Sequence, residues 1–565
     1  MMSLACEKSL FAGAVLCLSL LATLVQAADP AHLPATSTTR PPDYLKPDAG
    51  AFQLPTLDNQ LTIPTLTGST ERVRVGRVDF EGNTVLATPV LQAIAAPYVG
   101  RVVTVAELEA LRRALTLAYV ERGYVNSGVL LPRQIVDGVL VFSVVEGHLS
   151  AIRLHGMQRL DQRYLTQRLA PDKDVPLNIE VLRERFQLLL ADPLISRLNA
   201  RISPGVAPGE AMLDIDVTRA RSYQFSAFAN NYRPASIGSE SVGVTAMVHN
   251  LTTRGDILEA SVQSPPHFGQ GTHSTLAWQM PLGFAGTRIN IALERGSSSV
   301  VEEPTNVLDI RSTLDSTDVG LSRVVFESLR QKLALGLNRV SRKNRTWLLG
   351  EPFSFTPGDP TGSTQETLWR FWQDYSVRSE TQVLALRSTL TYGKNSLQDT
   401  AGLPESEVLA RQFHLWLGQA QFGRQVMDNG AQLVLRATLQ HTRDRLLALD
   451  GLAIGGVNTV RGYRENQLVR DKGAFVNFEF EYPLLREAAD GLSLTLIPFY
   501  DYGRAQNVGE AAVTLSSWGL GSRLQWQRFN LDLVLAKRLS HPDSVSGNGS
   551  TLQDHGVHLQ LAYRF

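Results

Sequence analysis

The last nine residues, Val557-His558-Leu559-Gln560-Leu561-Ala562-Tyr563-Arg564-Phe565, decide the fold class of the second half of the chain. Apolar side chains occupy every second position from Val557 to Phe565, and the residues between them are mostly polar. A period of two predicts a β-strand with one apolar and one polar face. The same alternation begins near Tyr223 and continues through the rest of the chain.

Two architectures produce such alternation. A soluble β-sandwich buries its apolar face against a second sheet, whereas a membrane β-barrel turns it toward lipid and keeps a polar lumen. Charges deep within the polar face, at Glu479, Glu481 and Arg523, favour the barrel because a dry core would penalise them. Residues 220–565, at about 10 residues per strand plus turns and loops, suit about 16 strands. We therefore predict a mainly β fold with a transmembrane antiparallel barrel of about 16 strands.

Residues 72–147 and 148–219 read as an internal repeat, each with the order strand, helix, helix, strand, strand. In the first repeat a single strand leads from Val73 to Phe80, Thr88 is the predicted cap of one helix, and Thr104 that of the next. In the second repeat the predicted caps are Asp161 and Asn178. Each repeat is predicted to be a small mixed sheet covered on one face by two helices.

The N-terminus has the pattern of a secretory signal peptide over residues 1–27, with Lys8 ahead of an apolar core and Val25-Gln26-Ala27 as the cleavage site. Residues 28–71 contain prolines throughout and predict an extended periplasmic linker. Both cysteines, Cys6 and Cys17, lie in the segment to be removed. The mature chain is therefore expected to have neither disulfides nor thiolate metal sites.

Charge and motif content exclude several classes of function. Lys+Arg 54 balances Asp+Glu 54, so no basic field is present to bind nucleic acid. The sequence has no Gly-x-Ser-x-Gly elbow, no His-Glu-x-x-His and no phosphate-binding glycine loop, and its histidines follow no metal-ligand spacing. We expect no catalytic residues, no metal and no cofactor.

One basic and one acidic residue stand out within the barrel sequence. Arg461 belongs to Val460-Arg461-Gly462-Tyr463, in the glycine-rich loop 451–473. Asp501 belongs to Phe499-Tyr500-Asp501-Tyr502-Gly503, which we expect to end a strand and to point Asp501 into the lumen. A planar guanidinium can hold a carboxylate bidentately, so we hypothesise that the loop folds inward and Arg461 meets Asp501. In a wet lumen the pair is expected to contribute modest energy, and a solvated loop arginine is the alternative.

These motifs carry a family resemblance. The first repeat opens with Val78-Asp79-Phe80-Glu81-Gly82-Asn83 and ends with Val144-Val145-Glu146-Gly147, and the barrel holds Val460-Arg461-Gly462-Tyr463 and Phe499-x-Asp501-x-Gly503. Residues 72–565 thereby resemble the outer-membrane transporters of two-partner secretion, the haemolysin and filamentous-haemagglutinin secretion/activation proteins. The resemblance implies that residues 72–147 and 148–219 are periplasmic POTRA domains and that Arg461 pairs with Asp501 on the inner wall.

The resemblance also implies a function. The chain would be an outer-membrane pore that captures an unfolded secreted partner, a large exoprotein of the adhesin or cytolysin type, and exports it through the lumen. Phe565, Tyr563 and Leu561 resemble the signal read by the barrel assembly machinery, and outer-membrane lipids are the remaining expected partner. A plug helix within residues 28–71 is doubtful because of the prolines. The alternatives are an insertase of the same superfamily, a passive porin and a barrel hydrolase.

Overall fold

The computed structural model describes residues 44, 72–131, 135–170, 175–266, 271–283, 286–398, 404, 408–486, 491–541 and 551–565. The predicted signal peptide and, apart from Tyr44, the predicted linker lie outside the described residues. The described residues divide into an N-terminal unit, which runs to Arg221 and also includes Thr252–Gly255, and a barrel unit that begins at Ser222. Within the described ranges, no helix combines the length and apolar composition needed to cross a membrane.

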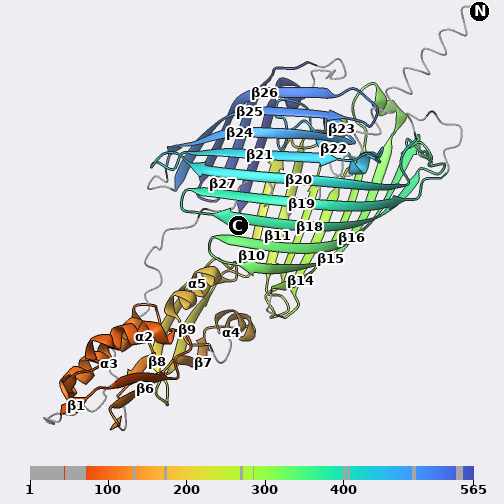
Figure 1. The fold of residues 1–565 in the computed structure, drawn as a ribbon. Helices are drawn as coiled ribbons and strands as arrows, with labels where there is room; N and C mark the ends of the chain where they lie inside the picture. Colours follow the sequence, from red (N-terminus) through yellow and green to blue (C-terminus); the bar gives the residue numbers. More distant parts are fainter. Residues whose placement is uncertain are drawn as a thin grey trace, which may run out of the picture. The chain divides into compact units, whose positions relative to one another are not determined.

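The described part of the N-terminal unit contains two larger sheets with their helices (Figure 1) and one two-stranded sheet. The elements of its first part are β1 (Arg72–Arg74), β2 (Arg77–Glu81), α2 (Thr88–Ala95), η1 (Ala96–Tyr98), β3 (Val102–Thr104), α3 (Val105–Val120), β4 (Gly128–Leu130), β5 (Ile135–Val136) and β6 (Val139–Val145). Those of the second are β7 (His148–His155), α4 (Arg163–Leu169), α5 (Ile179–Leu190), β8 (Ile195–Pro204) and β9 (Glu210–Arg219). The sheet orders are β2-β6-β4 and β7-β9-β8, with a parallel first pair and an antiparallel second pair in both.

Two glycines at equivalent positions show why the same motif recurs. Gly82 and Gly156 each follow the first strand of a repeat and have φ of +87° and +75°. A Cβ on Gly82 would lie 2.6 Å from the carbonyl oxygen of Val144, and a Cβ on Gly156 would collide with that of Val217. Both valines belong to the last strand of their repeat. Only glycine combines this backbone conformation with so close an approach.

Glu146, in the last motif of the first repeat, holds the start of that repeat in place. Its Oε1 accepts hydrogen bonds from the amides of Thr84 at 2.7 Å and Val85 at 2.9 Å, and from the Tyr119 hydroxyl at 3.1 Å. Burial, together with the neighbouring Glu146 carboxylate, raises the pKa of Tyr119 above its usual value. The hydroxyl therefore remains a donor to Glu146 throughout the physiological range.

The first predicted strand is wrong in one respect, because it is two strands that pair with different partners. β1 pairs with β3, and β2 pairs with β6. The chain changes partner at Val75, whose amide donates to Arg101 O at 2.9 Å, and Gly76, whose amide donates to Gly138 O at 2.7 Å. Val75 is fully buried there, so alternation continued through the break and concealed it.

Two of the four predicted helix caps are confirmed, and the other two are displaced by one residue. The capping box of Thr104 and Glu107 is confirmed, and so is the Asn178 cap, whose Oδ1 accepts from the amide of Glu180 at 2.9 Å. The cap of α2 is Ala87, one residue before the predicted Thr88, and Pro89 fills the first turn. The cap of α4 is Gln162 rather than Asp161, although Asp161 accepts from the Arg163 amide at 2.9 Å. Shifts of one residue are ordinary at helix ends, where the first amides have several possible acceptors.

The barrel unit is a closed antiparallel sheet of sixteen long strands, which confirms the predicted fold class (Figure 1). Its first eight long strands are β10 (Tyr223–Asn230), β11 (Ser241–His249), β12 (Ile257–Ser264), β13 (His273–Pro281), β14 (Thr287–Ser299), β15 (Arg311–Glu327), β16 (Gln331–Leu348) and β18 (Ser363–Arg378). The remaining eight are β19 (Gln382–Asn395), β20 (Gln412–Gln425), β21 (Gln432–His441), β24 (Lys472–Leu485), β25 (Leu492–Gln506), β26 (Val513–Trp526), β27 (Phe529–Arg538) and β28 (Val557–Arg564). β17 (Glu351–Pro352) is a short addition to β16, and β10 pairs with β28 to close the barrel.

Alternate residues of the wall face opposite environments, as the period of two predicts. Trp518 and Leu520 on β26 are 52% and 45% exposed, whereas Phe499 and Asp501 on β25 are 6% and 0% exposed. The outer face is therefore mainly apolar and accessible, and the inner face carries buried charged groups such as Asp501. The prediction that Asp501 lies at the end of its strand is wrong. β25 continues to Gln506, because Gly503 keeps its pairing with both Phe475 and Leu515.

Candidate functional site

The candidate site is the loop of residues 442–471, which joins β21 to β24. It contains the 3-10 turn η5 (Ala448–Asp450) and a hairpin of β22 (Leu452–Ile454) and β23 (Leu468–Arg470). Gly455, Gly456 and Gly462 have φ of +112°, +102° and +90°, conformations that other residues rarely adopt. These glycines let the hairpin tip turn sharply and present Val460-Arg461-Gly462-Tyr463 to the inner wall.

Arg461 and Asp501 are in direct bidentate contact. The guanidinium donates from Nε to Asp501 Oδ2 and from Nη2 to Oδ1, both at 2.7 Å. The backbone amide of Arg461 adds a third bond to Oδ2 at 3.0 Å. Asn477, opposite Asp501 on β24, donates to Oδ1 at 2.8 Å. Four donors therefore converge on one carboxylate, and three of them come from a single loop residue.

The rest of the Arg461 guanidinium is also occupied. Nη1 donates to Glu479 Oε1 at 2.6 Å, and the Cζ atom lies 3.6 Å from the centre of the Phe499 ring. Glu479 also forms an ion pair with Arg436. Charge-assisted bonds on one side and an aromatic face on the other satisfy the cation. We call Arg461, Asp501, Glu479 and Phe499 the tip anchor.

The expectation that water surrounds the Arg461–Asp501 pair in a wet lumen is wrong. The side chains of Arg461 and Asp501 are 5% and 0% exposed. The reason is a small apolar cluster at the hairpin, in which Val460 and Tyr463 pack with Leu452, Ile454, Leu468, Ala505 and Leu515. This cluster excludes water from around the pair. In such surroundings the loss of one partner costs about 3–5 kcal/mol, because the other charge is left buried and unpaired.

The other residues of the loop motif also contact the wall. The Gly462 amide donates to His558 Nε2 on β28 at 3.3 Å, and its carbonyl oxygen accepts from Arg538 Nε on β27 at 2.6 Å. The Tyr463 hydroxyl lies 2.6 Å from Ser540 O and 3.0 Å from Ser516 O. The four-residue motif is thus fastened to several neighbouring strands rather than to Asp501 alone.

Gly503 explains the last position of the second motif. A Cβ there would lie 2.8 Å from both Ile454 Cγ2 and Val460 Cγ2. The missing side chain provides the space into which the hairpin packs. The motif Phe499-x-Asp501-x-Gly503 lies on the lumenal face of β25. It therefore supplies an aromatic ring under Arg461, a carboxylate that binds Arg461, and a glycine that leaves space for the hairpin side chains.

Sequence reasoning missed several partners of the loop. Arg464 donates to Asp554 Oδ1 at 2.6 Å and to Glu302 Oε1 at 2.8 Å, and Glu465 accepts from the Val457 amide at 2.6 Å. Arg464 follows the recognised motif directly, which is the one signal that pointed to it. Asp554 lies in the 3-10 helix η6 (Leu552–His555) and Glu302 in a loop, both far from Arg464 in the sequence, so no periodic pattern identifies them.

A second contact holds the opposite end of the loop. Asp450, at the end of η5, accepts from Arg342 Nη1 on β16 at 3.2 Å, and both side chains are 2% exposed. Glu366 on β18 is buried close to the same pair. Gln440 donates to the carbonyl oxygen of Asp450 at 2.9 Å. We call Asp450, Arg342 and Glu366 the base anchor.

The predicted assembly-signal residues lie at the end of β28 on the outer face. Leu561 and Phe565 are 45% and 61% exposed, and the Tyr563 ring packs 4.9 Å from that of Phe565. The Phe565 amide donates to Phe225 O on β10 at 3.0 Å. Their role in assembly stays a prediction. No group of histidine, cysteine and carboxylate side chains in the described ranges has the arrangement of a metal site.

Comparison with known proteins adds to this geometry. The family of haemolysin secretion/activation proteins ShlB/FhaC/HecB matches residues 209–524, and the ShlB-type POTRA domain matches residues 73–147. The outer membrane transporter CdiB of Escherichia coli O6:K15:H31 is 22% identical over 73% of this chain and 69% of its own length. CdiB of Dickeya dadantii is 22% identical over 82% and 80%. The solved structure of CdiB from Escherichia coli has a TM-score of 0.68 at 21% identity, covering 90% of this chain and 93% of that one.

Proposed function

The chain belongs to the haemolysin secretion/activation protein family, and we propose that its lumen loop, fixed by the tip anchor, controls export through the barrel. It is an outer-membrane transporter of two-partner secretion with its POTRA region in the periplasm, and its partner is a secreted exoprotein. The observation that carries the proposal is the buried bidentate contact of Arg461 with Asp501.

Capture of the unfolded exoprotein begins at the POTRA region. The sheet β2-β6-β4 ends in β2, and the sheet β7-β9-β8 ends in β7 and β8. Such edge strands offer backbone donors and acceptors to an extended segment of the exoprotein. Residues 72–147 and 148–219 are the two domains that we propose to provide them. Removal of residues 72–147 should abolish retention of the exoprotein by the purified transporter, and undiminished retention would count against this step.

The polar inner wall gives the unfolded exoprotein a route through the barrel. Because no ATP is present outside the cytoplasm, the folding of the exoprotein itself must drive export. The exoprotein threads the lumen unfolded and then buries apolar surface as it folds outside, so its return becomes unfavourable. The lumen loop must leave its anchored position or shift within it for the polypeptide to pass. The tip anchor sets the free energy of that change, because its four donors to Asp501 must find other partners.

Arg461→Ala tests the proposal, with Arg443→Ala as its control. Arg443 lies in the same loop and is exposed. We expect Arg461→Ala to leave the barrel inserted, as judged by heat-modifiable migration, and to stop secretion of the exoprotein into the medium. Arg443→Ala should secrete normally. Unchanged export by an inserted Arg461→Ala protein would remove the tip anchor from the mechanism.

The finer assignments extend the proposal. The exoprotein is of the adhesin or cytolysin type, the chain catalyses no reaction, and nucleic acid is not a partner. Leu561, Tyr563 and Phe565 form the signal for the barrel assembly machinery, which the exposure of Leu561 and Phe565 at the end of the chain supports. Family membership and the two CdiB relatives favour export over the insertase and the passive porin. Accelerated insertion of unrelated barrels into liposomes by the purified chain would reverse that preference.

A further inference from the structure

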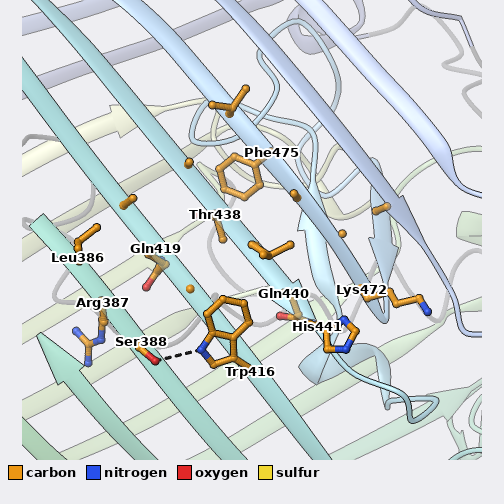
Figure 2. A pocket seen from close by; sticks show the side chains of 18 of the residues that line it. Leu386, Arg387, Ser388, Trp416, Gln419, Thr438, Gln440, His441, Lys472 and Phe475 are labelled. Atoms are coloured by element: carbon orange, nitrogen blue, oxygen red, sulfur yellow. Dashed lines mark hydrogen bonds between the residues drawn. The ribbon is translucent and has the colours of Figure 1, made fainter.

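A hollow of about 1070 Å³ lies on the barrel wall over β18, β19, β20, β21, β24 and β25 (Figure 2). Most of its lining residues have the outward register. Leu386, Leu439 and Tyr502 are 40%, 43% and 39% exposed, whereas their neighbours Thr438 and Asp501 are buried in the lumen. The hollow is therefore open to the side of the wall that faces lipid, and the export route does not include it.

Small residues of neighbouring strands form its floor. Gly418 on β20 lies opposite Ser388 on β19, and Ala420 lies opposite Ala437 on β21. One step further, Ala474 on β24 lies opposite Leu439. Side chains this small, side by side on adjacent strands, leave a trough in the wall. A straight hydrocarbon chain fits such a trough.

Trp416 forms one wall of the trough and is held there. Its indole Nε1 donates to Ser388 Oγ at 3.1 Å, as the dashed line in Figure 2 marks. A Cβ on Gly418 would lie 2.9 Å from the Trp416 ring, so the indole lies directly over that glycine. The hydrogen bond consumes the polar group of the indole, and the ring presents an apolar surface to the hollow.

Basic side chains lie at one end of the hollow. Lys472 and His441 are at the adjoining ends of β24 and β21 (Figure 2), and Arg504 lies opposite Ala474 on β25. The ion pairs of this region join Arg445 to Glu510 and Arg436 to Glu479, and none in the described part of the chain involves Lys472 or Arg504. Two cations at one end of an apolar trough match a phosphate attached to an acyl chain.

The strand topology shows which leaflet of the outer membrane lies at the level of Lys472 and Arg504. β10 begins directly after the periplasmic N-terminal unit, and all neighbours in the barrel are antiparallel. Following the strands back from β28 therefore places the end of β21, the start of β24 and the end of β25 at the opposite, extracellular end. The cations lie at the level of the outer leaflet, and the trough extends from them toward the membrane interior.

We propose that this hollow binds a phosphorylated lipid of the outer leaflet, with its phosphate on Lys472 and Arg504 and an acyl chain over Gly418, Ala420, Ala437 and Ala474. The site lies on β21 and β24, the two strands that the lumen loop joins. Bound lipid thus rests against both roots of that loop from the outside. The inference needs the outer-membrane location and is independent of whether the tip anchor controls export.

Native mass spectrometry of the full chain in detergent tests the proposal, with bis-phosphorylated lipid A and its dephosphorylated form as probes. We expect the phosphorylated probe to bind and the dephosphorylated one to bind about tenfold more weakly. Lys472→Gln with Arg504→Gln should lower the affinity for the phosphorylated probe by about the same factor. Lys537→Gln, an exposed cation on the outward face of β27, is the matched control and should bind as the wild type.

Ala437→Leu tests the trough without altering charge. The added side chain should obstruct the acyl chain and weaken binding of both probes, whereas Ala246→Leu, on the outward face of β11, should not. Heat-modifiable migration confirms that each variant is folded. Equal binding of the two probes, or wild-type binding by either the charge variant or Ala437→Leu, would overturn the proposal.

Discussion

The two ends of the lumen loop are fixed in opposite ways. At the tip the loop supplies the cation, Arg461, and the wall supplies the carboxylate, Asp501. At the base the loop supplies the carboxylate, Asp450, and the wall supplies the cation, Arg342. The tip carboxylate accepts four hydrogen bonds of 2.7–3.0 Å, and the base carboxylate accepts one side-chain bond of 3.2 Å.

The two anchors differ in how many hydrogen bonds their carboxylates accept and not in burial, since the side chains of both ion pairs are nearly inaccessible to solvent. Around the base anchor, Oδ2 of Asp450 and both oxygens of Glu366 accept from no amide, hydroxyl or basic group among the described residues, and the two carboxyl groups are each other's neighbours. A buried charge contributes stability only when its remaining donors and acceptors are matched. The tip is therefore the stronger attachment, and the base is the end that we expect to yield first.

Asp501→Ala should have the largest effect. It leaves Arg461 buried without its main partner, at a cost of about 3 kcal/mol or a hundredfold change in the loop equilibrium. Secretion of the exoprotein, measured in the medium, should fall accordingly. Asp532→Ala is the control, because Asp532 pairs with Arg523 on the same inner wall but is 31% exposed. Equal losses in both variants would mean that any lumenal ion pair suffices.

Exchanging the charges should fail at the tip. Arg461→Asp combined with Asp501→Arg restores opposite signs, yet the backbone amide of Arg461 and the Asn477 side chain also donate to the original carboxylate. An arginine at position 501 cannot accept these bonds, so we expect export to stay about tenfold or more below wild type. Recovery of export would show that charge alone, and not the hydrogen-bond geometry, defines the tip anchor.

Gly503→Ala should have an intermediate effect through packing. The new methyl group meets Ile454 and Val460 and should displace the hairpin by a few tenths of an ångström, at a cost of about 1–3 kcal/mol. Cysteine labelling at residue 463 from outside the cell reports this displacement. In Gly296→Ala the nearest atom is the movable His273 side chain at 3.3 Å, so labelling there should stay at the wild-type level.

Asp450→Asn should have the smallest effect. The amide can still accept from Arg342, and the substitution removes a negative charge that lies beside the Glu366 carboxyl group. We expect export to change by about threefold or less, while single-channel recordings show more frequent openings because the base is released and the tip is retained. A loss as large as that of Asp501→Ala would contradict the ranking of the two anchors.

The sequence was sufficient for the Arg461–Asp501 pair of the tip anchor and insufficient for Glu479 and for the base anchor. Period two placed Asp501 on the inner face, and the two short motifs marked its partner. Asn477 and Glu479 could not be assigned as partners, because the register of β24 against β25 depends on hairpin geometry that the pattern does not encode. Asp450 and Arg342 are 108 residues apart and belong to no recognisable motif. Burial of the pair depended on the apolar hairpin cluster, which only the folded loop creates.

The closure of the barrel between β10 and β28 is shorter than other strand pairings in the wall. β10 and β28 share five residue pairs, against seven for β12 with β13 and for β27 with β28. This junction is where the cylinder should part most readily, and amide hydrogen exchange should start there. The Asn231 side chain, which donates to Val557 O at 2.9 Å and accepts from the Leu559 amide at 2.8 Å, staples that seam. The lumen loop is bonded through Gly462 to β27 and β28, and β28 is also one side of the closure with β10. Release of the loop should therefore loosen the closure, and opening of the closure should loosen the loop.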